Sequence, residues 1–230
     1  MVAPSRVKSI LAVIALALAA PLQADEPPSP RDLLKSVRVA QSAQNWKLTG
    51  RIRTGNRKRP FRLIIENGMI RYEFLESGDT ITLRLGEKSS TLEETKGGKT
   101  GRITAAKFDA LVLDTPISYE DLALRFLYWT DATVIGGEMI AAHSCWKVQV
   151  RPPARKDSQY SSVTLWIGKD DGALMKAESY DDAGKWARRF TVTSVMKREG
   201  YWLLRQMRIE NAARAGGSNP TYLEIEDAEK

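Results

Sequence analysis

The sequence contains very few of the side chains that metal centres and nucleophilic active sites require. Its 230 residues include one cysteine, Cys145, and one histidine, His143. Zinc sites need clusters of His, Cys or carboxylate ligands, so this composition nearly excludes zinc. His143 and Cys145 lie two residues apart on a predicted strand, where side chains on one face compete for space and no third group orients a base. A lone cysteine forms no internal disulfide, so the core must hold the fold together.

Other catalytic patterns are also missing. No glycine-rich loop connects a strand to a helix, so nucleotide binding has no support. The acidic pairs Asp170-Asp171 and Asp181-Asp182 lie in predicted hairpin turns, where aspartate bonds the local backbone, and no glycosidase-type carboxylate pair stands out. We therefore expect no catalytic residues, no cofactor and no metal ion. Cys145 is predicted to be a small buried hydrophobe, and His143 a surface residue at a strand end.

The first 24 residues have the pattern of a secretory signal peptide. Arg6 and Lys8 form a basic region before the apolar run 10–20, which is about half the ~20 residues needed to span a bilayer. Cleavage is possible after Ala19 or Ala24, and Ala24 is favoured because acidic, proline-rich residues follow. No cysteine lies near this site, so lipidation is not available. We expect an exported, unlipidated protein.

The predicted organisation is a signal peptide over residues 1–24, a proline-rich linker over 25–30 and one domain over 31–230. Loss of the signal peptide leaves about 206 residues and lowers the net charge from +7 to about +5. The remaining Lys and Arg residues alternate with apolar residues along predicted strands, as on an ordinary solvated sheet face. This scatter gives no support for a nucleic-acid partner.

A long series of strands is the main feature of the chain. Between Trp46 and Glu226 apolar and polar residues alternate in short segments that are separated by turn signals such as Asn67-Gly68 and Asp171-Gly172. We count roughly eleven strands. Sequential hairpins at this spacing predict one antiparallel sheet that curls toward a barrel, in a mainly β protein with helices.

Two segments interrupt the two-residue period. Residues 31–44 have one apolar stripe at helical spacing and predict a helix that packs on the sheet. Residues 104–113 are consistent with either a short helix or an apolar loop. A clearer helix is predicted to begin at Ser118, with Asp121 at the capping-box position and Leu122, Phe126 and Trp129 at helical spacing.

The apolar surface of this sheet is the strongest indication of function. A curved sheet that closes incompletely leaves an inner trough that helices or a ligand must fill. Alternation groups residues on one face of each strand but does not say which face is concave. The candidate lining residues, from the strands and then from the helical segment, are Trp46, Leu48, Leu63, Ile65, Tyr72, Phe74, Leu83, Leu85, Phe108, Leu111, Phe126 and Trp129.

Short motifs along most of the predicted domain, best from residue 118 onward, are similar to a known family. They are Tyr119-Glu120-Asp121-Leu122-Ala123, Arg125-Phe126, Tyr128-Trp129, Gly137-Glu138, Cys145-Trp146-Lys147-Val148, Tyr160, Leu165-Trp166-Ile167, Leu174, Tyr180-Asp181 and Gly184-Lys185. In order and spacing they resemble the broad, mostly uncharacterised branch of the LolA-like outer-membrane lipoprotein-sorting family. That resemblance implies an unclosed antiparallel β-barrel with a helical lid and a hydrophobic cavity for lipoprotein acyl chains, in a periplasmic protein.

The resemblance also implies a function. We expect a soluble periplasmic carrier or chaperone, a monomer, that binds acyl chains of lipoproteins or lipids and moves them toward the outer membrane, with inner-membrane export machinery and an outer-membrane acceptor as partners. In the best-known carrier of this kind an arginine latches the lid, and Arg51, Arg53 and Arg62 are the candidates here. Two alternatives stay open: an envelope sensor domain that binds a partner protein, and an enzyme of unrecognised type.

Overall fold

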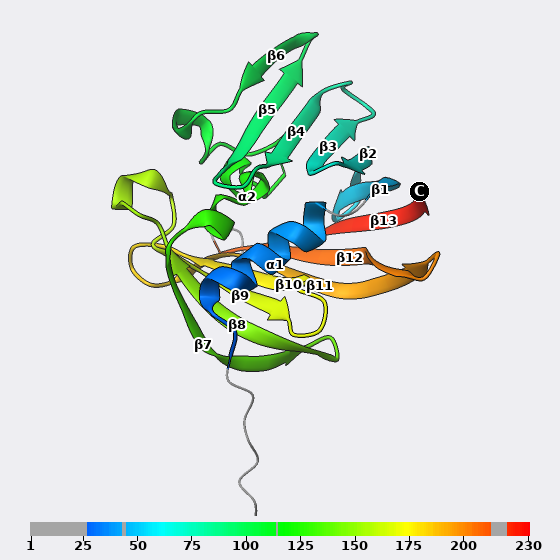
Figure 1. The fold of residues 1–230 in the computed structure, drawn as a ribbon. Helices are drawn as coiled ribbons and strands as arrows, with labels where there is room; N and C mark the ends of the chain where they lie inside the picture. The colour runs from blue at the N-terminus through cyan, green and yellow to red at the C-terminus, as the bar shows by residue number, and fades with distance from the viewer. Residues whose placement is uncertain (1–26, 43–44, 114, 213–219) are drawn as a thin grey trace, which may run out of the picture.

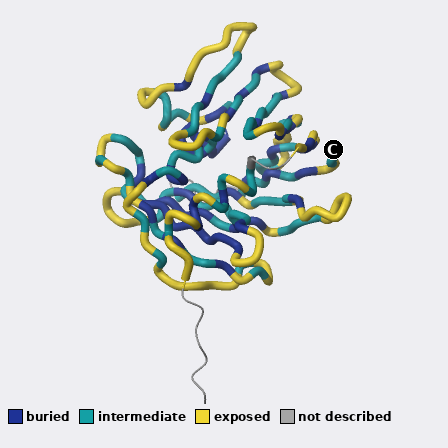
Figure 2. Tube along the Cα trace, viewed as in Figure 1, coloured by how far each residue is buried: buried dark blue, intermediate teal, exposed yellow. Residues whose placement is uncertain are grey.

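In the computed structural model, thirteen antiparallel strands within the described part of the chain form one continuous sheet, and helices lie against its concave side (Figure 1). The structure describes residues 27–42, 45–113, 115–212 and 220–230. The predicted signal peptide lies outside the described residues, as do the first two residues of the predicted linker. Residues on the strands are largely buried or half-buried, whereas the hairpin tips are exposed (Figure 2).

Consecutive strands pair as hairpins, except where the helical segment between β6 and β7 intervenes. In chain order they are α1 (Pro30–Ser42), β1 (Trp46–Thr54), β2 (Arg57–Glu66), β3 (Met69–Phe74), β4 (Thr80–Leu85), β5 (Ser90–Lys96), β6 (Lys99–Arg102), the 3-10 turn η1 (Ala105–Lys107), α2 (Tyr119–Ala123), η2 (Arg125–Tyr128), β7 (Asp131–Ile140), β8 (His143–Arg151), η3 (Arg155–Asp157), β9 (Ser162–Gly168), β10 (Leu174–Tyr180), β11 (Trp186–Arg198), β12 (Tyr201–Asn211) and β13 (Thr221–Glu229).

The sheet is built from two meanders, the first from β1 to β6 and the second from β7 to β13, which meet where β1 lies beside β13. The strand order is β6-β5-β4-β3-β2-β1-β13-β12-β11-β10-β9-β8-β7, so β1 pairs with β13 and joins the two meanders. β6 and β7 are the two edges, and residues 103–130 connect one edge to the other. The sheet is therefore unclosed, which confirms the predicted fold class. The expected strand count of about eleven is lower than the thirteen strands found among the described residues.

The junction between the meanders depends on Gly50. The register between β1 and β13 shifts between Thr49 and Gly50. A Cβ atom at Gly50 would lie 2.2 Å from the backbone oxygen of Glu224, so no other residue fits without movement of the backbone. A bulge of this kind bends a strand and increases its twist, and both favour a curved sheet.

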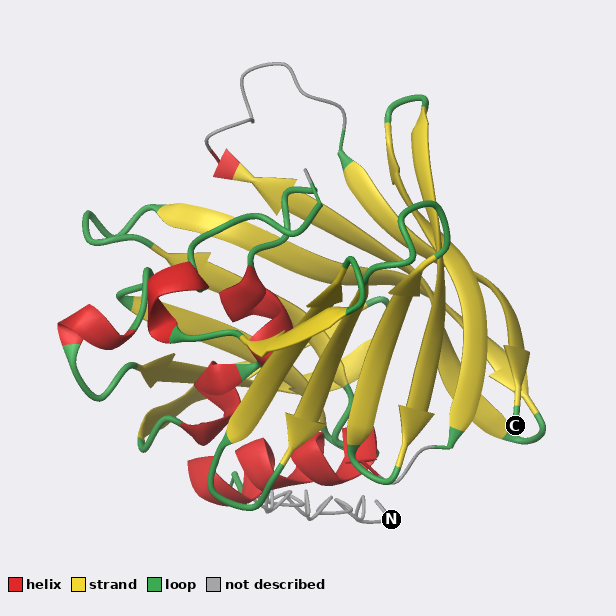
Figure 3. Ribbon diagram, turned by 90° about the horizontal axis from the view of Figure 1, so that it is seen from above, coloured by secondary structure: helices red, strands yellow, loops and turns green. Residues whose placement is uncertain are grey.

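Helix α1 covers the second meander. Its predicted apolar stripe is buried: Leu33, Leu34 and Val37 pack with Val148 and Leu165 of the β7–β13 half. Figure 3 shows the helices gathered along one side of the molecule, against the strands. Helix α1 therefore packs on the concave face of the sheet, and its apolar stripe predicts this packing on the sheet.

The helical segment between the edges differs from its prediction. Ser118 and Asp121 form the predicted capping box at the start of α2. The helix ends at Ala123, however, because Leu124 adopts a left-handed backbone conformation with φ +49°. The predicted continuous helix to Trp129 is therefore wrong. A separate 3-10 turn, η2, follows, and Thr104–Leu113 contains only the short turn η1 and a loop.

Candidate functional site

A cavity of about 500 Å³ lies between the concave face of the sheet, α1 and the α2–η2 segment. This volume is within the range of small-molecule binding sites in proteins, which are mostly apolar with a few polar groups. Most of the side chains that line it are aliphatic or aromatic, and they come from both meanders. The cavity therefore exists because two halves of the sheet and two helical segments leave a space that no side chain fills.

Six of the twelve residues proposed from the sequence line this cavity. Leu48, Leu63, Ile65, Tyr72 and Leu83 come from β1 to β4, and Phe126 comes from η2. The five strand residues share one face of the sheet, and because they line the cavity this face is the concave one. The structure thus decides which of the two alternating faces is internal.

The other six lie outside the lining. They are Trp46, Phe74, Leu85, Phe108, Leu111 and Trp129. Trp46, Phe74 and Trp129 are packed into the core around the cavity, and Trp46 makes an edge contact with the Tyr201 ring, with centroids 6.0 Å apart. Leu111 is 37% exposed and forms an isolated β-bridge with Ser118, outside the strands of the sheet.

Much of the lining comes from elements that contribute none of the twelve residues proposed from the sequence. They are α1 and β10 to β13, which contribute Val37, Ala40, Leu174, Met175, Ala177, Phe190, Val192, Val195, Leu203, Leu204, Met207, Ile209, Leu223 and Ile225. Alternation on these strands gives the same signal as on β1 to β4. What was not evident from the sequence is that β13 pairs with β1, which brings both meanders around one space.

The Tyr72 hydroxyl is a polar group inside this apolar lining. Among the described residues no hydrogen-bond partner contacts it, while its ring lies 6.0 Å from the Phe61 ring. Burial raises the pKa of Tyr72 to about 12. Tyr72 is only half-buried by exposed area, because part of its ring faces the cavity rather than other side chains. It is therefore a neutral donor available to whatever enters.

A buried polar cluster fixes α2 to the sheet. Asp121, which also lines the cavity, accepts hydrogen bonds from the Ser118 backbone N–H (2.7 Å), the Ser118 hydroxyl (2.7 Å) and the Tyr160 hydroxyl (2.6 Å). It also pairs with Arg188 of β11. Both side chains of this pair are nearly inaccessible. Burial, and then the Asp121 charge, raise the pKa of Tyr160, so this hydroxyl stays a donor.

Arg188 is the arginine that joins the helical segment to the sheet. The three candidates from the sequence lie on the outer face instead. Arg51 and Arg53 both pair with Glu224 of β13, and Arg62 pairs with Glu73. Expecting a lid contact from these three is therefore wrong: they alternate with core residues such as Leu48 and Ile52, so they point away from the concave side.

Helix α1 is also bonded to the η2 turn. The Arg38 guanidinium donates to the backbone carbonyl of Leu127 and lies 4.8 Å above the Tyr128 ring. The Tyr128 hydroxyl in turn donates to the carbonyl of Gly86, at 2.9 Å. The two helical segments that cover the cavity are thus connected to each other and to the first meander.

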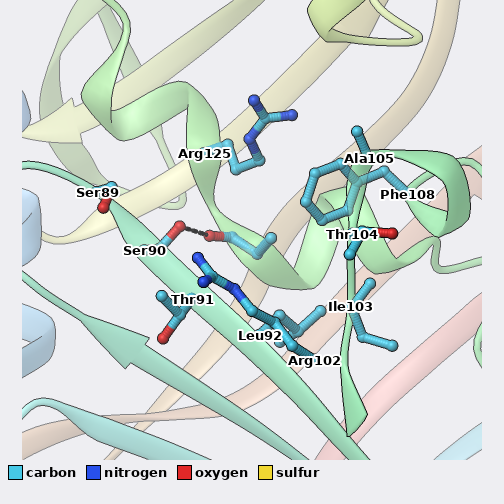
Figure 4. A pocket seen from close by; sticks show the side chains of 11 residues that line it. Ser89, Ser90, Thr91, Leu92, Arg102, Ile103, Thr104, Ala105, Phe108 and Arg125 are labelled. Carbon is cyan, nitrogen blue, oxygen red and sulfur yellow. Dashed lines mark hydrogen bonds between the residues drawn. The ribbon is translucent and has the colours of Figure 1, made fainter.

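A smaller pocket of about 370 Å³ lies on the other side of α2 (Figure 4). Its lining is more polar, and Arg102 and Arg125 approach it from β6 and η2. The Arg125 guanidinium donates to the Asp157 carbonyl (2.7 Å) and stacks over the Phe108 ring (4.7 Å). The Ser90 hydroxyl donates to the Ala123 carbonyl. Residues 121–126 therefore separate a polar pocket from the apolar cavity.

Cys145 and His143, two residues apart on β8, lie in different surroundings. Cys145 is buried, as predicted, and burial raises the pKa of its thiol to about 11. His143 begins β8, as predicted, but is half-buried at the rim of the cavity. No three His, Cys, Asp or Glu side chains in the described part of the chain gather as a metal site would require. No helix in that part is long and apolar enough to cross a membrane.

Comparisons with known proteins agree with this architecture. A protein-family profile described as "uncharacterized protein" matches residues 95–230, whereas no curated protein matches. Among solved structures, an outer membrane lipoprotein-sorting protein domain from Vibrio parahaemolyticus superposes with a TM-score of 0.70 at 15% identity, over 87% of this chain and 91% of that one.

Two further structures have the same fold. A DUF1329 family protein from Desulfovibrio piger superposes with a TM-score of 0.63 at 20% identity, over 87% of this chain and 91% of that one. A LolA superfamily protein from Nitrosomonas europaea gives 0.61 at 14% identity, over 88% and 94%. At these identities the likeness to each structure is one of fold. The chain therefore belongs to the family of uncharacterized proteins whose profile it matches, and it shares its fold with a LolA superfamily protein.

Proposed function

We propose that this protein is a periplasmic carrier that holds acyl chains of lipoproteins or free lipids in the 500 Å³ cavity and delivers them toward the outer membrane. The observation that carries the proposal is the cavity itself, an apolar space between two meanders and two helical segments. Burial of each CH₂ group contributes about 0.8 kcal/mol, so one chain of ordinary length binds tightly yet reversibly.

Entry of a chain requires the helical cover to move relative to the sheet. The α2 segment contributes Leu122 and Leu124 to the lining and is bonded to β11 through Asp121 and Arg188. We propose that this buried pair holds the cover closed around the empty or filled cavity. Tyr72 supplies a hydrogen-bond donor for the ester or amide carbonyl at the head of a chain.

Export and cargo class are part of the same proposal. The predicted signal peptide supports a periplasmic location. One structure with the same fold is described as an outer membrane lipoprotein-sorting protein domain, which supports lipoprotein acyl chains as cargo. A membrane export complex as donor and an outer-membrane acceptor complete the proposed route, with a monomer as the carrier.

The proposal is tested by the lipid content and the lipid affinity of the purified protein. Native mass spectrometry after gentle purification is expected to show bound acyl lipid, and the stripped protein is expected to bind a fluorescent fatty acid. Ala40→Trp places a large side chain in the cavity and is expected to reduce probe affinity at least tenfold. Val39→Trp, one residue away on the exposed side of α1 (52% exposed), is the matched control.

Two outcomes would contradict the carrier. One is a protein that never binds lipid or probe. The other is an empty protein that captures a single folded partner, which supports an interaction domain instead. Equal probe affinity in the Ala40→Trp and Val39→Trp variants would place binding outside the cavity.

A further inference from the structure

The tip of the β11–β12 hairpin carries two exposed aromatic side chains. Tyr201 is 53% exposed and Trp202 is 60% exposed, next to the turn at Glu199-Gly200. Isolated exposed hydrophobic residues are common, but two adjacent large aromatic rings at a projecting turn are costly in water. Figure 2 shows that this tip is exposed. Aromatic rings with one polar end are enriched where proteins meet the interface between water and lipid headgroups.

Basic side chains surround these rings. The Lys197 ammonium lies 5.7 Å from the centroid of the Trp202 ring, and Lys230 lies 4.4 Å from that of Tyr201. Arg198 pairs with Tyr201 across the hairpin, while Glu199 is the acidic residue of the turn. The cations Lys197, Arg198, Lys230 and Lys47, the last of which pairs with Glu229 across β1 and β13, outnumber the carboxylates of Glu199 and Glu229, so this region is electropositive. It is therefore complementary to a surface that is both anionic and partly apolar.

The tip also borders the large cavity. Gly200, Tyr201 and Trp202 belong to its lining, together with His143 of β8 and Gly172 of the β9–β10 turn. Three hairpin ends of the second meander therefore lie at the rim of the cavity. A surface that docks at this rim would face the opening rather than the closed wall of the sheet.

We propose that the β11–β12 tip docks on an anionic phospholipid surface, with Trp202 and Tyr201 at the headgroup level and Lys197, Arg198 and Lys230 on lipid phosphates. Docking in this orientation turns the rim of the cavity toward the bilayer. The inference goes beyond the carrier function, since it concerns the surface from which a chain is taken or to which it is given. Vesicle binding does not require any cargo to be identified.

Vesicle co-sedimentation of the full protein tests the docking. Wild-type protein is expected to sediment with vesicles of phosphatidylethanolamine and phosphatidylglycerol, and less with pure phosphatidylcholine or at high salt, because salt screens exposed charges. Each cation near an anionic surface contributes about fivefold in partitioning, so Lys197→Gln combined with Arg198→Gln is expected to reduce binding about 25-fold. Trp202→Ala is expected to reduce it through loss of the aromatic anchor.

The opposite end of the sheet provides matched controls. Leu75 is 52% exposed in the β3–β4 turn, and Arg57 and Lys58 are exposed basic residues at the β1–β2 turn. Leu75→Ala, and Arg57→Gln with Lys58→Gln, are expected to leave vesicle binding unchanged. Equal losses in tip and control variants would refute the proposal, as would wild-type protein that does not sediment. Binding by the tip only to an envelope protein, with vesicles ignored, would refute it too.

A parallel measurement separates this inference from the carrier function. Lys197 and Arg198 do not line the cavity, so the double Gln variant is expected to retain wild-type affinity for a fluorescent fatty acid. Protein that binds the probe but no vesicle would refute docking and leave the carrier intact. Protein that binds anionic vesicles through the tip but no probe would refute the carrier and leave docking intact.

Discussion

Replacement of Arg188 by methionine is expected to destabilise the protein more than any surface charge change. The Arg188 side chain is 9% exposed and that of its partner Asp121 is 4% exposed. Removal of one member of a buried ion pair typically costs 3–5 kcal/mol, because the other charge stays buried without compensation. Asp121 keeps three donors, from Ser118 and Tyr160, which places the expected loss near the lower limit, about 3 kcal/mol.

The loss is measured by urea unfolding, followed by tryptophan fluorescence and far-UV circular dichroism. Arg62→Met is the matched control, since Arg62 and Glu73 form an exposed pair that is expected to contribute less than about 1 kcal/mol. The double variant Arg188→Met with Asp121→Asn removes the buried charge as well. It is expected to be more stable than the sum of the single losses predicts, by at least about 1 kcal/mol.

A different result would refute the role given to this pair. If Arg188→Met costs no more than Arg62→Met, the buried pair does not hold α2 on the sheet. If the two single losses simply add in the double variant, the side chains are not coupled. A fatty-acid probe then adds a functional test: a looser cover is expected to speed probe release in the Arg188→Met variant.

Three further predictions concern single positions. The pKa of Tyr72 is raised to about 12 from an ordinary 10.0, so the folded state favours the neutral form of its hydroxyl. The free energy of unfolding of the wild type, relative to that of Tyr72→Phe, is therefore expected to fall as the pH rises from 10 through 12. A difference between the two proteins that does not change with pH would contradict this. Gly50→Ala should cost roughly 1–3 kcal/mol in urea unfolding, since its Cβ meets the Glu224 carbonyl; an unchanged midpoint would mean that the junction adapts freely. Glu199→Asn should stabilise the protein by roughly 0.5–1 kcal/mol, because Glu199 has φ +47° directly before Gly200 and the pair Asn-Gly favours a turn with positive φ at both residues. Glu199→Val is expected to destabilise the protein, because a β-branched residue does not favour this conformation.

Local sequence patterns predicted those secondary-structure elements whose formation depends on residues close together in the chain. The two-residue period found the buried strands, and the Ser118–Asp121 capping box found the start of α2. The edge strand β7 gives no clear strand signal in the sequence, because most of its residues are exposed and Gly136 and Gly137 interrupt its alternation. The sequence predicts that Leu124 lies within a helix, because a leucine gives no sequence signal for the left-handed conformation that it adopts. Six of the twelve proposed lining residues line the cavity, because alternation groups residues by face but does not show which face is internal.

The sequence by itself determined a β-rich chain, its hairpin turns and the scarcity of His and Cys side chains. The tertiary structure alone decided that β13 pairs with β1, that the apolar face of both meanders surrounds one cavity, and that Arg188 rather than Arg51, Arg53 or Arg62 bonds α2. The physical reason is the separation along the sequence between the residues that interact. Side-chain alternation is a property of adjacent residues, whereas Asp121 and Arg188 are 67 positions apart, and their meeting depends on how the whole sheet curves.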